Sequence, residues 1–95
     1  MSEARRGWSV YTEKVPATDI RDWPPDLARK TVNFLRALAL EAGAAVDAGR
    51  KPPGDPMDDL GMRYSLQVDG EPVLFEYQVV PEAREIRIPV LVWFG

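Results

Sequence analysis

Residues 62–93 constrain the fold of this chain most strongly, because they form the pattern of two consecutive β-hairpins. Asp69-Gly70 indicates a two-residue turn, since a type I′ turn needs positive φ at both central positions. A second turn is expected over residues 81–84, where Pro81 favours bending. The strand pairs predicted from the first turn are Leu66 with Val73, Tyr64 with Phe75 and Met62 with Tyr77. Those from the second turn are Val79 with Ile86, Tyr77 with Ile88 and Phe75 with Val90.

The two hairpins assign the residues of their shared strand to the same faces, because side chains alternate with a period of two along a strand. One face is apolar and is predicted to be the core. Its members are Met62, Tyr64, Leu66, Val73, Phe75, Tyr77, Val79, Ile86, Ile88, Val90 and Val92. The other face is mixed, with Arg63, Ser65, Gln67, Leu74, Glu76, Gln78, Arg87, Pro89, Leu91 and Trp93.

The first half of the chain predicts one strand and one main helix. Residues 8–15 alternate as a strand would, and Asp22 to Pro25 is a helix-start signal. Apolar residues then recur at helical spacing at Leu27, Thr31, Leu35, Leu38, Ala42 and Ala45. The helix is expected to end between residues 42 and 48, with Gly49 as its C-cap and a loop over residues 50–59. A short extra helical turn over residues 18–23 also fits.

The predicted order is β-α-β-β-β, an α+β fold with an antiparallel sheet packed on one main helix. The 95 residues fit one domain over 8–95, after a flexible tail at 1–7. No secretory signal or membrane-length apolar run is evident, and the absence of cysteine fits a reducing cytoplasm.

Composition disfavours several kinds of chemistry. The chain has no cysteine for thiolate chemistry and no histidine, the usual general base and commonest metal ligand. Asp55, Asp58 and Asp59 lack the spacing of a calcium-binding loop, so neither a metal nor another cofactor is expected. The net charge of −3 disfavours broad nucleic-acid binding.

The C-terminal pattern resembles the RelE/ParE toxin superfamily. The resemblance rests on Tyr64-x-Leu-x-Val, Gly70, Val73-x-x-x-Tyr77-Gln-Val-Val and Ile86-x-Ile-x-Val-x-Val. It covers about the last forty residues well and the helix loosely. The resemblance implies the β-α-β-β-β fold and an antitoxin partner.

The chain departs from the ribonucleases of that family, which carry basic residues on the second and third strands and a basic or aromatic group after the last strand. Here the second strand has Ser65 and Gln67, and the last strand ends Trp93-Phe94-Gly95 with no terminal Arg, Lys, His or Tyr. Attack by a ribose 2′-hydroxyl needs a base, an acid and positive charge on the phosphate. Arg63 and Arg87 supply charge, but no base is evident. The resemblance therefore implies the fold without the ribonuclease activity.

The charged candidates have plainer interpretations. Arg63 is expected opposite Glu76, which favours a cross-strand ion pair over a phosphate ligand. Arg87 is expected on a solvated sheet face, and Arg50-Lys51 is a short basic pair in a loop.

The end of the last strand is the predicted partner-binding surface. It consists of Trp93, Leu91 and Leu74 on one face, with Phe94 beside them. The alternative is that Trp93-Phe94 caps the core of its own chain. Pro89 fits either an edge strand or a bulge.

Three functions stay open. The first is a toxin–antitoxin-type protein that acts by protein binding, held by an antitoxin-like segment or a second copy. The second is a ribosome-dependent mRNA endoribonuclease with an atypical site built from Arg63, Arg87, Glu76 and Lys51. The third is a stand-alone binding domain that has lost the toxin role.

Overall fold

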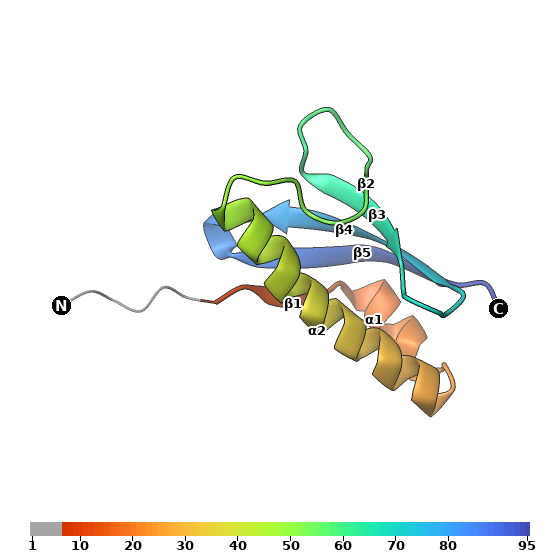
Figure 1. Ribbon diagram of the computed structural model, residues 1–95. Coiled ribbons are helices and arrows are strands. Elements are labelled where there is room, and N and C mark those ends of the chain that lie inside the picture. Colours follow the sequence, from red (N-terminus) through yellow and green to blue (C-terminus); the bar gives the residue numbers. More distant parts are fainter. Residues whose placement is uncertain (1–6) are drawn as a thin grey trace.

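The computed structural model describes residues 7–95, and most of the tail expected at residues 1–7 lies outside this range. The elements are β1 (Ser9–Thr12), α1 (Lys14–Arg21), α2 (Pro25–Asp47), β2 (Asp55–Pro56), β3 (Arg63–Gln67), β4 (Val73–Val80), the 3₁₀ turn η1 (Pro81–Ala83) and β5 (Glu85–Trp93). Five strands form one sheet in the order β1-β5-β4-β3-β2 (Figure 1). The α+β class predicted from the sequence is confirmed.

The sheet is mixed, whereas the sequence predicted an antiparallel one. β1 runs parallel to β5, with Val10 opposite Ile86 and Thr12 opposite Ile88. Two helices separate β1 from the rest of the sheet, which gives the chain enough length for the long connection that a parallel pair requires. As a result β5 is an internal strand over residues 85–88, and Pro89 lies directly after the residues that pair with β1.

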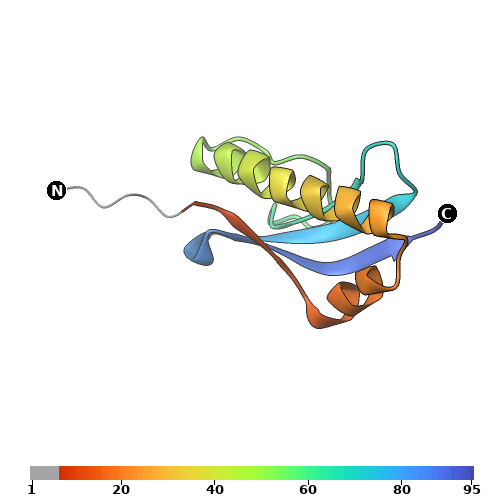
Figure 2. The ribbon, with the colours of Figure 1, turned by 90° about the horizontal axis from the view of Figure 1, so that it is seen from below.

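α2 lies across one face of the sheet, and α1 lies beside the C-terminal end of β5 (Figures 1 and 2). α2 begins at Pro25 and ends at Asp47, within the predicted range. Gly49 has a φ of 70° and follows the last turn, as expected of a C-terminal cap.

The extra helical turn predicted over residues 18–23 is instead the two-turn helix α1. Pro16 lies in its first turn, where a missing N–H breaks no helical hydrogen bond.

The β3–β4 hairpin has a longer loop than the sequence predicted. Leu66 pairs with Phe75 rather than Val73, a shift of two residues. Gly70 has the positive φ expected, at 76°. A two-residue turn would place Pro72 in the ladder, where it has no N–H to donate. The ladder instead starts beyond Pro72, with the N–H of Val68 donating to the carbonyl of Val73 at 2.8 Å. A register shift of two residues leaves each side chain on its predicted face of the sheet.

A bulge in β5 overturns part of the predicted face assignment. The β4–β5 register changes between Glu76 and Gln78, so that Ile88 and Pro89 together lie opposite Tyr77. Pro89 cannot donate to the ladder, which favours an irregularity at this point. Beyond the bulge the faces exchange, with Leu91 buried and Val92 exposed. The sequence predicted the reverse.

The core lies between α2 and the central strands. Phe75 and Tyr77 are fully buried, and Phe75 meets Phe34 of α2 edge-on with ring centroids 6.0 Å apart. Tyr77 stacks on Tyr64 and donates its hydroxyl hydrogen to the carbonyl of Pro53. Burial raises the pKa of Tyr77 above its ordinary value, so this hydroxyl stays neutral. The contact also fastens the loop after α2 to the sheet.

A cluster of three side chains joins the residue before β1, the end of α2 and the turn before β5. Arg84 binds both carboxylate oxygens of Asp47, at 3.0 and 2.9 Å. Its guanidinium also lies 5.2 Å from the ring centre of Trp8. The indole N–H of Trp8 donates to Asp47 at 3.2 Å. An added Cβ at Gly43 would lie 2.2 Å from the Trp8 ring, so glycine permits this close packing.

Candidate functional site

The sheet face opposite α2 carries a row of polar side chains that crosses four strands. Arg63 of β3 pairs with Gln78 of β4, Gln78 pairs with Arg87 of β5, and Arg87 pairs with Tyr11 of β1. Neighbouring strands lie about 5 Å apart, so the two arginine backbones are separated by about 10 Å. This row is the first candidate site, and two of its members were candidates from the sequence.

Both arginines of this row are held by carboxylates. Arg63 donates to Glu76 through Nε at 3.0 Å and through a terminal nitrogen at 2.7 Å, which confirms the predicted ion pair. Glu76 lies diagonally across the strands rather than directly opposite, because of the register shift. Arg87 donates to Glu85 at 2.8 Å. That hydrogen bond is the main cause of the raised pKa of Arg87. The charge available to a phosphate is therefore reduced at both positions.

Tyr11, like Gln78, was not a candidate from the sequence. Its side chain is 51% exposed, and its phenol is the group in this row that can exchange a proton without already carrying charge. The alternation of residues 8–15 was a visible signal for a strand. That pattern did not predict that this strand pairs in parallel with β5, which places Tyr11 beside Arg87.

Lys51 does not join this row through any described contact. It lies in the loop after α2 and lines a separate hollow together with Glu41 and Arg50. Asp58, one of the three loop aspartates, accepts a hydrogen bond from the N–H of Met62 at 3.1 Å. Over residues 7–95 no group of three or more side chains is arranged to bind a metal ion.

The predicted partner-binding residues are divided between the two faces of the sheet. Leu74 is 45% exposed on the open face, whereas Leu91 is buried in the core. Trp93 pairs with Val73 on the helix side and lies against Trp23, with ring centroids 5.9 Å apart. Phe94 is 61% exposed. The bulge at Pro89 thus separates Leu74 from Leu91 and Trp93, and the single surface predicted from the sequence does not form.

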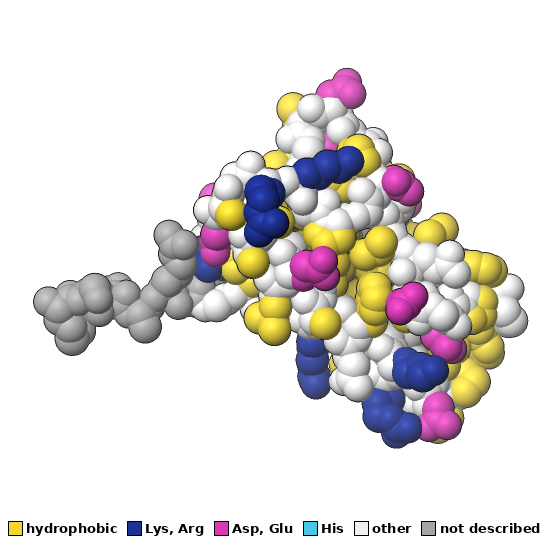
Figure 3. Space-filling view, in the orientation of Figure 1, with side chains coloured by type: hydrophobic (Ala, Val, Ile, Leu, Met, Phe, Trp, Pro, Cys, Tyr) yellow, Lys and Arg dark blue, Asp and Glu magenta, His cyan; other side chains and the backbone are white. Residues whose placement is uncertain are grey.

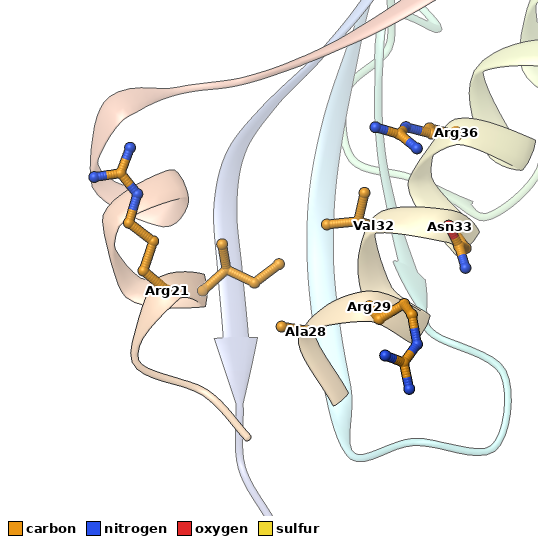
Figure 4. A pocket seen from close by; sticks show the side chains of 7 residues that line it. Arg21, Ala28, Arg29, Val32, Asn33 and Arg36 are labelled. Atoms are coloured by element: carbon orange, nitrogen blue, oxygen red, sulfur yellow. The ribbon is translucent and has the colours of Figure 1, made fainter. Parts of the chain in front are cut away.

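A groove between α1 and α2 is the second candidate site. It has a volume of about 520 Å³ and is lined by Ile20, Arg21, Ala28, Arg29, Val32, Asn33 and Arg36. α1 and α2 lie on either side of it, with Arg29 and Arg36 on α2 and Arg21 on α1, and the guanidinium of Arg21 extends away from α2 (Figure 4). Arg29 and Arg36 lie outside the apolar stripe that the sequence predicted for α2. The sequence did not indicate the opposite wall of the groove, because it predicted only a short turn where α1 forms.

Elsewhere on the helix-bearing face, charges of both signs alternate with uncharged surface (Figure 3). Lys30 of α2, for example, pairs with Glu71 of the hairpin loop at 3.3 Å. A broad basic surface of the kind that follows a nucleic-acid backbone is therefore not visible on this face.

Comparison with known proteins identifies the fold. The sequence matches no protein-family model, and no curated protein is significantly similar to it in sequence. Among solved structures, the chain is similar to Escherichia coli toxin RelE, in a variant with two arginines changed to alanine, in complex with a peptide of antitoxin RelBc. The TM-score is 0.65 and the sequence identity 9%, over 95% of this chain and 86% of that one.

Within the described residues, no helix is long and apolar enough to cross a membrane. The similarity to RelE extends over both helices and the whole sheet, and is not confined to the C-terminal meander on which the sequence resemblance rested. The chain has a RelE-like fold.

Proposed function

We propose that this chain is a toxin–antitoxin-type protein that acts by protein binding and is held by an antitoxin-like partner. The observation that carries the proposal is the RelE-like fold, matched to a toxin that was solved with its antitoxin peptide bound. Fold alone does not determine activity, so the side chains must decide between binding and catalysis.

The open sheet face favours binding over RNA cleavage. Each of its two row arginines is already paired, Arg63 with Glu76 and Arg87 with Glu85. A phosphate would have to displace these carboxylates and would meet their negative charge. Apolar side chains lie on the same face, with Leu74 directly opposite Val92 and both about half exposed. A mixed surface of ion pairs and exposed aliphatic groups is typical of protein interfaces.

Growth after induced expression tests this proposal. Expression of the chain alone is expected to slow growth of a bacterial host, and co-expression of the product of the adjacent gene is expected to restore it. The two products should also co-purify as one complex. A chain that leaves growth unchanged and binds no neighbour product would instead support a stand-alone binding domain.

One observation supports a second function, ribosome-dependent mRNA cleavage. Tyr11 lies next to Arg87 in the row that also contains Arg63, so a proton-exchanging group and two cations share a face. In such a site the phenol would exchange a proton with the reacting oxygens, and the guanidinium groups would stabilise the charge on the phosphate. Cleavage of mRNA on purified ribosomes that is lost in Tyr11→Phe would establish this function.

A further inference from the structure

We infer that the groove between α1 and α2 binds one amphipathic helix of a partner, with an apolar ridge flanked by carboxylates. The inference rests on the proposed function, because it assigns the surface that the antitoxin-like partner would occupy. It is drawn from the shape, the lining and the charge of the groove.

The floor of the groove is apolar. Ile20 of α1 packs partly buried against the core, and Ala28 and Val32 of α2 are also partly exposed. Ala28, Val32 and Arg36 are four residues apart and so lie along one line of α2. This line is about 12 Å long, a little over two helical turns. Ridges of one helix pack into the grooves between others, so the floor accommodates a helical segment of about eight residues.

The rim of the groove is basic, in a chain whose net charge is −3. Three arginines line it, and none of the lining side chains is a carboxylate. Arg29 is paired with Asp26 of its own helix. Neither Arg21 nor Arg36 forms an ion pair with another residue that the structure describes. Each helix therefore carries one lining arginine without a described ion-pair partner, and these long side chains are available to acids that flank an inserted ridge.

A protein helix explains these features better than a nucleic acid does. A phosphate backbone would use the arginines but would leave Ile20, Ala28 and Val32 without an apolar partner. An uncharged apolar helix would fill the floor but would leave the rim cations unpaired. An acidic amphipathic helix satisfies both parts of the groove, through the helix-in-groove mode of recognition.

Binding of synthetic peptides to the intact chain tests the inference. The probe is a labelled helical peptide of about 18 residues, long enough to form a helix, with leucine and alanine on one stripe and glutamate beside it. A second peptide carries lysine at every glutamate position. In fluorescence anisotropy the acidic peptide is expected to bind at least about tenfold more tightly than the basic one.

Matched variants locate the binding surface. The double variant Arg21→Glu/Arg36→Glu is expected to lower the affinity for the acidic peptide at least about tenfold, since attraction becomes repulsion on both walls. Val32→Ser should weaken binding of the same peptide without changing any charge. Arg50→Glu changes another exposed arginine, outside the groove, and is expected to alter the affinity by about twofold or less.

Three results would overturn the inference. The first is equal affinity of the chain for the acidic and the basic peptide. The second is an equal loss of affinity for the acidic peptide in Arg50→Glu and in the groove double variant, and the third is a short RNA that binds through Arg21 and Arg36 while the acidic peptide does not bind.

Growth assays separate this failure from failure of the proposed function. If the groove double variant is toxic and is still neutralised by the adjacent gene product, the proposed function stands and the partner docks elsewhere.

Discussion

Phe75 illustrates how far a single residue can be predicted from the pattern. Its place on the core face was expected, and it is fully buried against Phe34. We expect Phe75→Ala to lower the free energy of unfolding by about 3–5 kcal/mol, because truncating a large core residue loses burial and leaves a cavity. Leu74→Ala changes the neighbouring, exposed residue and is the control. It should lower the free energy of unfolding much less. A loss below about 1 kcal/mol for Phe75→Ala in urea denaturation would contradict the core described here.

Thr31 is a buried residue whose hydroxyl has no hydrogen-bond partner in the structure. The sequence pattern included it in the apolar stripe of the helix without giving a role to its oxygen. Thr31→Val keeps the shape and removes the desolvated hydroxyl, so we expect it to stabilise the chain by about 1 kcal/mol. Thr18→Val is the control, because the hydroxyl of Thr18 is exposed and donates to the carbonyl of Lys14. A destabilised Thr31→Val variant in thermal melts would mean that this hydroxyl is satisfied in solution.

The residues of the candidate sites were predicted unevenly, for a physical reason. The ion pair of Arg63 and Glu76 followed from strand register, which is local, and it survived a two-residue error because long side chains reach diagonal neighbours. The role of Tyr11 depends on which distant strand lies beside β1, and the hydrophobic period of the sequence carries no information about that. Arg21 was not a candidate because the sequence predicted only a short turn where α1 forms.

At the scale of elements, the β3–β4 hairpin depends on the turn around Gly70. This glycine has a φ of 76°, a region that β-branched residues avoid and asparagine tolerates. Gly70→Val is expected to lower the melting temperature by several degrees, as about 1–2 kcal/mol of backbone strain would do in a domain of this size. The Gly70→Asn variant should have a melting temperature close to that of the unchanged chain. Equal melting temperatures for the Val and Asn variants would contradict the turn geometry.

The two register differences show why an error of one residue matters more than an error of two. The longer loop before Val73 moves the pairing by two residues and leaves each side chain on its predicted face. The bulge at Pro89 adds one residue and moves Leu91 into the core. The sequence signalled an irregularity through Pro89, but a missing N–H alone does not distinguish a bulge from an edge strand.

At the scale of the whole molecule, local patterns predicted the α+β class and the meander, but not the parallel pairing of β1 with β5. That pairing joins the beginning of the chain to its last strand, and the Trp8, Asp47 and Arg84 cluster fastens it. Such contacts between distant residues have no signature in a single sequence. They nevertheless create the four-strand row, which requires Tyr11 of β1 beside Arg87 of β5.

We therefore propose different roles for the two sites, with partner binding in the groove and no catalysis on the open face. The most direct test is growth after induced expression of the double variant Arg63→Ala/Arg87→Ala, compared with the unchanged chain at equal protein level. Both arginines are partly exposed, so the variant is expected to fold. The variant is expected to slow growth as much as the unchanged chain does. A toxic unchanged chain and a harmless variant, with mRNA cleavage present only in the former, would contradict this assignment and establish the ribonuclease.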